Sequence, residues 1–492
     1  MSEKRPNIVL ITTDQQRFDT LAAAGNEFIL TPHLDWLCDQ GIRFDRAYSD
    51  APLCVPARAT IMTGRHHHRN FFESGGSQQT PMAQHPTLAS MLTQAGYQTR
   101  QVGKTHFHPE RSRYGYEHID LDQDFFRYLS RHPHLGDPTG HGVGQNEMSP
   151  VILSTDERYT LTRWITDKSI DFLETRDPNH PFFMHVSYAD PHPPFAVPRN
   201  YWDLYRDRPV PEPVFGDWSK EFDDIPFGFR EPTLVLNNAQ RYAQHRIEDI
   251  RRAYYASITQ VDYSLGLLLA RMRELDLLGN TWIVFTSDHG DMLGDHHLGA
   301  KSIFLEGSAH VPFIVRPPQY WDVYNWQGNL DPTGMGGTSS DALVCLADLM
   351  PTFLDFAGVE RPDHQLDGIN FMEAAQGSGG RDHLFGNFKE NYMHLKGSWK
   401  YHYTAIGGAE QLFNLDEDPY ECCDLSASPE YCALLEDLRT EAASYFEQLG
   451  DPAAGDGRFR VTQGVPEDIA AYRRDRTWPG FHTPFGPRSI MH

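Results

Sequence analysis

The chain has 492 residues, which is more than one domain usually contains and enough to bury a large core. Its 43 Lys and Arg residues are outnumbered by 67 Asp and Glu residues, and the formal net charge of −24 argues against nucleic acids and anionic membrane surfaces as partners. An anionic substrate must therefore be attracted by a local positive site and not by the overall field.

The N-terminal segment is charged and continues directly into a strand-like pattern at residues 7–13, without the apolar stretch of a secretory signal. No run of the sequence reaches the ~18 apolar residues of a membrane span. The six cysteines are scattered and show no disulfide framework. These features predict a cytoplasmic protein.

Helical and strand patterns alternate along the first three quarters of the chain. Strands are predicted at 7–13, 97–102, 181–187 and 281–286, and helices at 32–41, 57–63, 87–95 and 252–275. The alternation predicts an α/β fold with a large, mostly parallel sheet between helices. Residues 194–235, rich in proline and aromatic residues, are predicted to be an irregular excursion that walls the active site.

The sequence changes character after a glycine-rich stretch at 377–380. Strand patterns at 383–388, 392–396 and 399–404 and a helix at 430–449 predict a smaller C-terminal α+β domain over 378–450, following a catalytic domain over 1–377. Residues 451–492 have no clear periodicity. They are interpreted either as an arm that packs on a neighbouring subunit, in a dimer or tetramer, or as a surface tail.

Cys54 begins the most informative segment of the chain. It precedes a predicted helix start with Pro56 in the first turn, and a spacing of four places Arg58 on nearly the same face. Helix N–H groups and a guanidinium together can seat a tetrahedral oxyanion. Taken alone, Cys54 is a nucleophile, the precursor of a modified nucleophile, or a small buried hydrophobe.

Two polar pairs follow two predicted strands. Asp14 and Gln15 come directly after residues 7–13, and Asp288 and His289 come shortly after 281–286. Because ligands of α/β sheets bind at the carboxyl ends of strands, these pairs offer a divalent cation a rigid set of donors. Alone, either aspartate could equally be a turn residue or a helix cap.

The string C-x-P-x-R followed by A-T-I-M-T-G-R resembles the signature of the type I sulfatases of the alkaline phosphatase superfamily. The match runs from residue 7 to about 315 in the family's order, with further similar elements at Gly103-Lys104-Thr105-His106, Asp190-Pro191-His192 and Lys301. Residues 411–421 add a pattern that resembles the tail of the family's sequences. The resemblance implies a sulfuric ester hydrolase with an alkaline-phosphatase-like fold. It also implies that a formylglycine-generating enzyme converts Cys54 to Cα-formylglycine.

The resemblance further implies one divalent metal, Ca²⁺ in the first place and Mn²⁺ as the alternative. Its implied ligands are Asp14, Gln15, residue 54, Asp288 and His289. The catalytic residues besides Cys54 are implied to be a set of cations and histidines: Arg58, Lys104, His106, His192 and Lys301. In this scheme the cations balance the charge on the sulfuryl group, His192 protonates the leaving alcohol with Lys301, and His106 takes the proton that releases sulfate.

Gln15 departs from the family's usual Asp-Asp pair and removes one negative charge. His289 also suits transition metals better than Ca²⁺. In Gln15 the chain resembles relatives that hydrolyse phosphonate monoesters and phosphodiesters, which implies that activity on the same scaffold as the alternative. Lys104 and His106 favour a sulfatase instead, because the resemblance implies that phosphonate hydrolases of this superfamily tend to have other residues at these two positions. A non-catalytic relative is a third interpretation. The substrate is expected to be a small-molecule or saccharide sulfate ester, in a pocket shaped by residues 66–80, 108–150 and 194–235.

Three consecutive histidines, 66–68, suggest a metal site at first sight. Neighbouring residues point in different directions, so these side chains are not expected to converge on one ion. They are predicted to lie on the surface or at an edge that faces the substrate.

Overall fold

The computed structural model of the chain describes residues 5–73, 85–139, 141–237, 239–318, 336–363 and 365–476. Part of the predicted substrate-pocket segment, residues 74–80, and the last residues of the predicted tail, 477–492, lie outside the described residues. Within the described ranges, no helix combines the length and the apolar character needed to cross a membrane.

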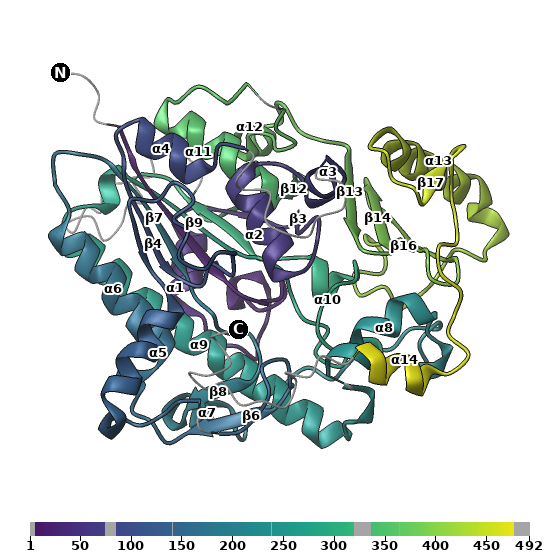
Figure 1. Cartoon of the computed structure of the whole chain (residues 1–492), viewed down its shortest axis with the longest axis horizontal. Coiled ribbons are helices and arrows are strands. Elements are labelled where there is room, and N and C mark those ends of the chain that lie inside the picture. Colours follow the sequence, from purple (N-terminus) through teal and green to yellow (C-terminus); the bar gives the residue numbers. More distant parts are fainter. Residues whose placement is uncertain are drawn as a thin grey trace.

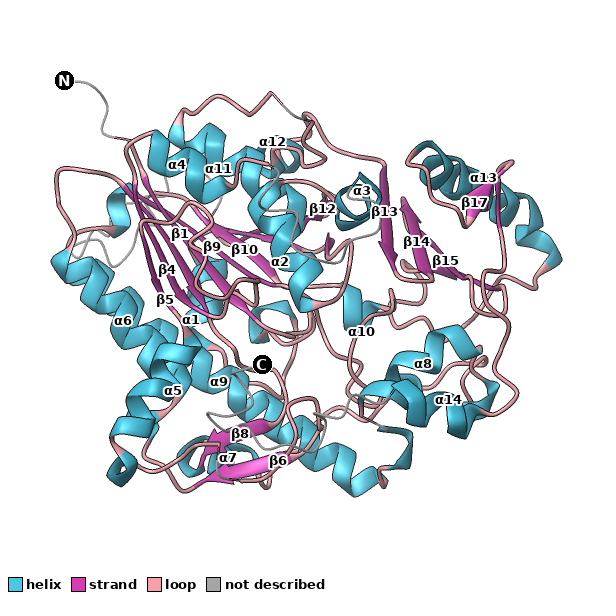
Figure 2. Cartoon of the chain, viewed as in Figure 1, coloured by secondary structure: helices cyan, strands magenta, loops and turns pink. Residues whose placement is uncertain are grey.

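The catalytic region is built on an eight-stranded sheet in the order β11-β2-β10-β9-β1-β7-β4-β5 (Figures 1 and 2). Its neighbouring strands pair in parallel except at β10, which is antiparallel to both β9 and β2. The strands are β1 Asn7–Thr13, β2 Ile42–Phe44, β4 Gln98–Gly103, β5 His118–Asp120, β7 Phe182–Ser187, β9 Thr281–Ser287, β10 Phe313–Arg316 and β11 Thr338–Ser340. The predicted large, mostly parallel sheet is confirmed.

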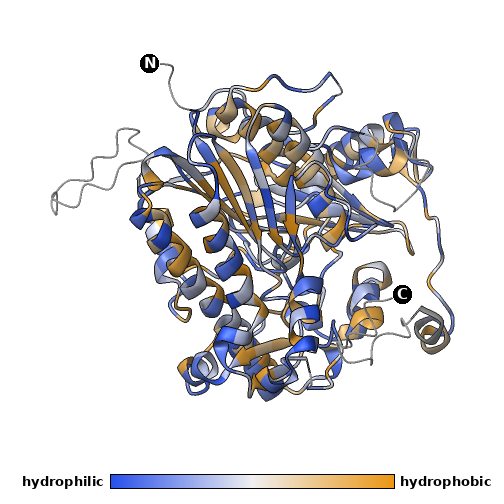
Figure 3. Cartoon of the chain, turned by 60° about the vertical axis from the view of Figure 1, so that its left-hand side comes forward, coloured by the Kyte–Doolittle hydropathy of each residue, from blue (hydrophilic) through white to orange (hydrophobic). Residues whose placement is uncertain are grey.

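The central strands are apolar on both faces because helices cover both faces. Along β1, Ile8 and Leu10 join one buried core and Val9 and Ile11 the other. The first core is covered by α2 Cys54–Thr63, α4 Leu88–Gln94, α11 Leu349–Ala357 and α12 Phe371–Ala375, and the second by α1 Pro32–Asp39, α6 Leu161–Thr175 and α9 Gln244–Glu274. In Figure 3 apolar residues follow the strands of this sheet, and the outer helices carry polar residues as well.

Two helices extend further than the sequence predicted. Helix α2 begins at Cys54 instead of 57, because Leu53 is extended and Pro56 fits within the first turn. Helix α9 begins at Gln244 instead of 252. In its added turns Ile247 and Ile250 face the core, and most of the other residues are at least partly exposed to solvent. Cys54 therefore lies at the N-terminal end of α2, and not before it.

The segment predicted to be irregular contains regular structure. It holds β8 Phe195–Pro198, α7 Arg199–Tyr205 and α8 Phe227–Leu236. β8 pairs in parallel with β6 Pro150–Leu153, and α5 Asp122–Arg131 lies on the same side of the molecule (Figure 1). These elements were not predicted from the sequence because each is short and proline occurs within or beside them.

The C-terminal region has a separate antiparallel sheet in the order β13-β14-β15-β16 (Figure 2). Its strands are β13 His383–Phe388, β14 Asn391–Lys396, β15 Trp399–Thr404 and β16 Ala409–Asn414, and α13 Cys432–Gln448 packs on it. Shorter elements complete the described chain: β3 Ala47–Tyr48, β12 Val344–Cys345, β17 Ala454–Gly455, β18 Arg458–Phe459, α3 His67–Glu73, α10 Glu306–Ala309 and α14 Ile469–Arg476. The predicted α+β character of this region is confirmed, with β16 as an additional strand.

Candidate active site and metal centre

The two polar pairs predicted from the sequence meet at the carboxyl edge of the large sheet. β1 and β9 are parallel neighbours in a register that pairs Thr13 with Ser287, so the residues that follow them are adjacent. The N–H of Gln15 donates to Asp288 Oδ1 at 3.1 Å, and the N–H of Asp288 lies 3.3 Å from the carbonyl of Thr13. Sheet geometry alone therefore brings Asp14 and Asp288 together.

Helix α2 points its first residue at these carboxylates. The side chains of Asp14, Cys54, Asp288 and His289 are all buried, and each offers one ligand atom within 4.8 Å of the others. Cys54 Sγ lies 3.6 Å from Asp14 Oδ1 and 3.3 Å from His289 Nε2, which is 3.6 Å from Asp288 Oδ1. His289 Nδ1 lies 2.9 Å from the carbonyl of Gly290, an arrangement that leaves Nε2 free to bind a metal.

Gln15 is fixed by Asp291, a buried carboxylate that the sequence patterns did not indicate. The Gln15 amide Nε2 donates to Asp291 Oδ2, and Lys301 donates to the amide oxygen. The other carboxylate oxygen of Asp291 accepts from the N–H of Leu293 at 2.8 Å. Residue 15 thus has no carboxylate of its own but is hydrogen-bonded to the carboxylate of Asp291. Its only sequence signal was its place three residues after Asp288, in the loop that ends β9.

Arg58 connects the two carboxylates. Its Nε donates to Asp288 at 2.9 Å and its Nη2 to Asp14 at 3.2 Å, while Nη1 donates to the carbonyl of Lys104 and the hydroxyl of Ser187. All of these groups are buried. The guanidinium therefore holds the ends of β1, β9, β7 and β4 in one arrangement.

Two lysines concentrate positive charge around Cys54. Lys301 Nζ lies 3.6 Å from Sγ, and Lys104 Nζ lies 2.5 Å from Asp14 Oδ2. Burial would raise the pKa of the Cys54 thiol, but Lys301, Lys104 and His289 outweigh burial and hold this pKa well below its usual range. This is the local positive focus that the acidic composition requires for an anionic substrate.

His106 and His192 complete the surroundings of Cys54, since both lie near enough to its side chain to shift the pKa of the thiol or to be shifted by it. The Nδ1 of His192 lies 2.7 Å from the carbonyl of Pro193, so the other ring nitrogen is the one available to the site. Burial, with Lys301 and Lys104, lowers the pKa of His192 to about 4. A bound anion would offset the two lysine charges and raise that pKa.

A small cavity of about 140 Å³ adjoins Lys104 and His192. Its wall is mainly apolar, with Phe125, Phe126, Leu161, Pro193 and Pro194 among the lining residues. Asp122, His141 and Gln145 add polar groups. Of the predicted pocket segments, 108–150 contributes most and 194–235 only its first residues, while no described residue of 66–80 lines this cavity.

The predicted surface position of the three histidines is wrong for two of them. His66 and His68 are 7% and 0% exposed, because the C-terminal region covers α3. His66 Nδ1 lies 3.4 Å from Asp50 Oδ2, and His68 Nε2 lies 2.8 Å from the hydroxyl of Tyr445 on α13. His68 thus joins the two parts of the chain, whereas His66 pairs within the N-terminal part.

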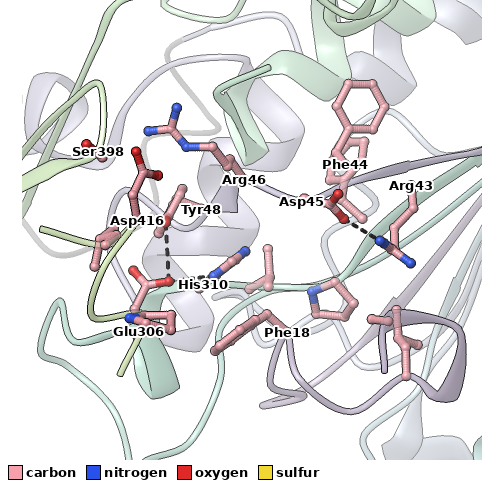
Figure 4. Close-up of a pocket in the computed structure, with 17 residues that line it drawn as sticks. Phe18, Arg43, Phe44, Asp45, Arg46, Tyr48, Glu306, His310, Ser398 and Asp416 are labelled. Carbon is pink, nitrogen blue, oxygen red and sulfur yellow. Dashed lines mark hydrogen bonds and ion pairs between the residues drawn. The ribbon is translucent and has the colours of Figure 1, made fainter. Parts of the chain in front are cut away.

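A second group of buried charges, the interdomain cluster, consists of Tyr48, Glu306, His310, Lys400 and Glu421. Lys400 Nζ lies 2.7 Å from Glu306 and 2.9 Å from Glu421, and His310 Nδ1 lies 2.5 Å from the second oxygen of Glu306. Figure 4 shows Tyr48, Glu306 and His310 beside a cavity of about 330 Å³, where the His310 ring stacks on Phe18 with centroids 4.0 Å apart. The charges here are paired with one another.

Comparison with known proteins agrees with this geometry. The family model described as Sulfatase matches residues 6–359. An arylsulfatase of Clostridium perfringens is 35% identical over 467 residues, which cover 88% of this chain and 93% of that protein. A choline-sulfatase of Rhizobium meliloti is 30% identical over 464 residues, covering 87% and 84%. A solved phosphonate monoester hydrolase of Agrobacterium radiobacter has a TM-score of 0.72 at 26% identity, covering 90% of this chain and 96% of that one.

Proposed function

The chain belongs to the sulfatase family and is a sulfuric ester hydrolase, and we propose that it cleaves the sulfate ester of a small, largely apolar alcohol through a formylglycine at position 54. The observation that carries the proposal is the convergence on one side chain. Lys301, His106, His192 and His289 all contact the Cys54 side chain, and two carboxylates lie beside it.

The chemistry of the donor set supports a modified residue 54. A thiolate is a soft ligand, whereas carboxylate and amide oxygens select hard cations. A hydrated aldehyde at position 54 replaces the sulfur by two hydroxyl groups on one carbon, which supplies a nucleophile and a second hydroxyl for release of the sulfate. The conversion requires a formylglycine-generating enzyme as partner.

The residues around position 54 fit a divalent cation. Asp14 and Asp288 are buried carboxylates, and His289 presents its Nε2 to Cys54 Sγ at 3.3 Å. Gln15 Nε2 is held by Asp291, and its amide oxygen faces Lys301, whose Nζ lies 3.6 Å from the same sulfur. We propose Asp14, Gln15, residue 54, Asp288 and His289 as ligands, with Ca²⁺ as the metal and Mn²⁺ as the alternative that the imidazole favours. The cation would act as a Lewis acid and lower the pKa of the nucleophile.

The side chains of the chain supply the remaining steps. Lys104 and Lys301 neutralise the sulfuryl oxygens, and Arg58 keeps the two carboxylates in place for them. His192 faces both residue 54 and the cavity, so it donates a proton to the departing alcohol once the bound anion has raised its pKa. His106 accepts the proton whose loss releases sulfate.

The cavity beside His192 favours an aryl or comparably compact alcohol. Its volume of about 140 Å³ and its phenylalanine and proline walls suit a single ring better than a chain of sugars. This agrees with the arylsulfatase among the relatives. Sulfated monosaccharides and choline sulfate are the competing substrates that a panel should include.

A phosphonate monoester hydrolase activity is the second candidate, because Gln15 departs from the usual Asp-Asp pair and the imidazole of His289 suits a transition metal better than Ca²⁺. The solved hydrolase of that kind with a TM-score of 0.72 has the same fold. Lys104 and His106, which both reach the site, favour sulfate.

The test measures kcat/KM for an aryl sulfate and for the matching aryl phosphonate on one preparation, together with peptide mapping of the Cys54 peptide. Formylglycine lies about 18 Da below cysteine, so the mapped peptide reports the conversion. We expect the sulfate to be the better substrate by about a hundredfold or more. The rate with the sulfate should rise in proportion to the converted fraction. A preference for the phosphonate would replace the proposal by the second candidate.

A further inference from the structure

The C-terminal region contains a second cluster of metal-binding side chains that shares no residue with the active site. His383 on β13, His394 on β14 and Glu441 on α13 each offer one ligand atom, and these atoms lie within 4.8 Å of one another. His394 is fully buried, whereas the side chains of His383 and Glu441 are 35% and 38% exposed. The cluster therefore joins the hairpin to the helix at a solvent-accessible edge.

The distances within this cluster match a tetrahedral ion. His383 Nδ1 lies 2.9 Å from His394 Nε2, and Glu441 Oε2 lies 3.7 and 3.8 Å from these two nitrogens. Bonds of 2.0–2.2 Å to nitrogen and oxygen give ligand-to-ligand edges of about 3.3–3.6 Å in a tetrahedron. The three observed edges bracket this value, so rotations of the side chains by small angles would close the site.

The histidine at the centre of the cluster is already oriented as a ligand. His394 Nδ1 lies 3.1 Å from the carbonyl of Leu438, which assigns the proton to Nδ1 and leaves the lone pair of Nε2 facing the other two groups. Its ring stacks on Phe385 with centroids 4.4 Å apart, and Phe385 stacks on Tyr445 of α13.

Lys396 is the group that competes with a cation here. Its Nζ lies 2.8 and 3.1 Å from the two oxygens of Glu441. Both side chains are part-exposed, and an ion pair of this kind contributes little stability. A metal can displace it at small cost, and the lysine weakens the site without blocking it.

We propose that His383, His394 and Glu441 form a second metal site, which takes Zn²⁺ with water as the fourth ligand and fastens the β13–β14 hairpin to α13. Two imidazoles and one carboxylate are ligands that suit Zn²⁺ and not Ca²⁺ or Mg²⁺. The donor set differs in this respect from the oxygen-rich active site. This second site is independent of the proposed reaction.

The test uses the full-length protein, stripped with a chelator and dialysed against Zn²⁺, with bound metal measured by elemental analysis. We expect wild type to bind about one Zn²⁺ per chain more than His383→Gln, because that variant removes one of three ligands. His180→Gln is the matched control: His180 is an exposed histidine that pairs with Asp177, and its loss should leave the count unchanged. Equal Zn²⁺ counts in wild type and His383→Gln would overturn the proposal.

Three further measurements keep the result clear if His383→Gln folds poorly. Glu441→Gln removes a part-exposed ligand and should abolish both the extra Zn²⁺ and any rise in Tm that Zn²⁺ gives to wild type. Lys396→Met removes the competitor and should tighten Zn²⁺ binding by about two- to fivefold. In wild type, Co²⁺ should give the strong visible absorption of four-coordinate cobalt, which Glu441→Gln loses. Its persistence in Glu441→Gln would also refute the site.

Discussion

The active site and the interdomain cluster are both buried groups of charged side chains, yet their charges are satisfied in different ways. In the interdomain cluster the charged groups pair with one another. Lys400 contacts one oxygen of Glu306 and one oxygen of Glu421. The second oxygen of Glu306 pairs with His310, and the second oxygen of Glu421 accepts from the backbone N–H of Glu306. In the active site, by contrast, lysine and histidine donors converge on the single side chain of Cys54.

This difference separates structure from function. A charge network whose members pair with one another holds elements together and offers nothing to a ligand. A network whose donors converge on one point is prepared for charge that arrives or develops there. Substitutions in the active site should therefore affect turnover, and substitutions in the interdomain cluster should affect stability.

The largest effect is expected for Cys54→Ala. Loss of the nucleophile should lower kcat for an aryl sulfate by about 10⁴-fold or more. Tm should stay within a few degrees of wild type, since Arg58 continues to pair with Asp14 and Asp288. Cys54→Ser should retain attack and stall as a covalent sulfate ester, visible as an added mass, because serine lacks the second hydroxyl. Near-normal turnover in Cys54→Ala would remove the distinction between the two clusters.

Lys400→Met should have the largest effect on stability. The substitution leaves Glu306 and Glu421 buried without their shared cation, which costs about 3–5 kcal/mol of unfolding free energy in comparable sites. Denaturant unfolding measures this loss, and kcat per folded molecule should not change. Lys396→Met is the control in the neighbouring strand, because its part-exposed partner Glu441 limits the loss to about 1 kcal/mol or less in chelator. Similar losses in both variants would contradict a structural role for the interdomain cluster.

Asp291→Asn tests whether a residue outside the cluster sets its metal affinity. The asparagine would keep one oxygen for the N–H of Leu293 and turn its NH₂ toward Gln15 Nε2. Two facing donors repel, so the Gln15 amide should flip and withdraw its oxygen from the cation. We expect affinity for the catalytic metal to fall about 10- to 100-fold, measured by competition with a chelator. Unchanged affinity would show that Gln15 does not bind the metal.

The fold was largely predictable because its central strands are long and apolar. β1, β7 and β9 are buried on both faces, and their boundaries match the predicted strands to within a residue. β2, β8 and β10 have only three or four residues and gain their stability from neighbours distant in sequence. No local pattern could indicate them.

The candidate site likewise has some contacts that the sequence pattern indicates and others that it does not. Asp14 and Asp288 could be paired from sequence because parallel strands end at the same edge. Asp291 could not, since its role depends on a loop that turns its carboxylate back toward Gln15. The burial of His68 could not be predicted either, because it depends on α13, which lies nearly 380 residues later and packs on this histidine. Contacts set by tertiary packing leave no periodic trace in the sequence.

The smallest expected effect is a pH dependence confined to the interdomain cluster. Burial and the neighbouring Glu306 raise the pKa of Glu421 from its ordinary 4.5 to about 7, despite Lys400. Because the folded state then binds more protons than the unfolded state between these values, this group's contribution to stability is full below pH 4.5 and is lost as the pH rises through 7. Glu421→Gln cannot ionise and removes that dependence.

Unfolding free energies of wild type and Glu421→Gln, measured from pH 4.5 to 7.5, isolate this contribution as their difference. We expect wild type to lose stability relative to the variant as the pH rises across the window. Glu306, whose pKa is held at about 2 by Lys400 and His310 against the effect of burial, is ionised throughout in the folded state. It is present in both proteins, so its own contribution cancels in the difference. A relative stability that rises with pH would mean that Lys400 outweighs burial at Glu421 as it does at Glu306. The interdomain cluster would then hold two ionised carboxylates around one lysine, and its charges would no longer be satisfied by one another.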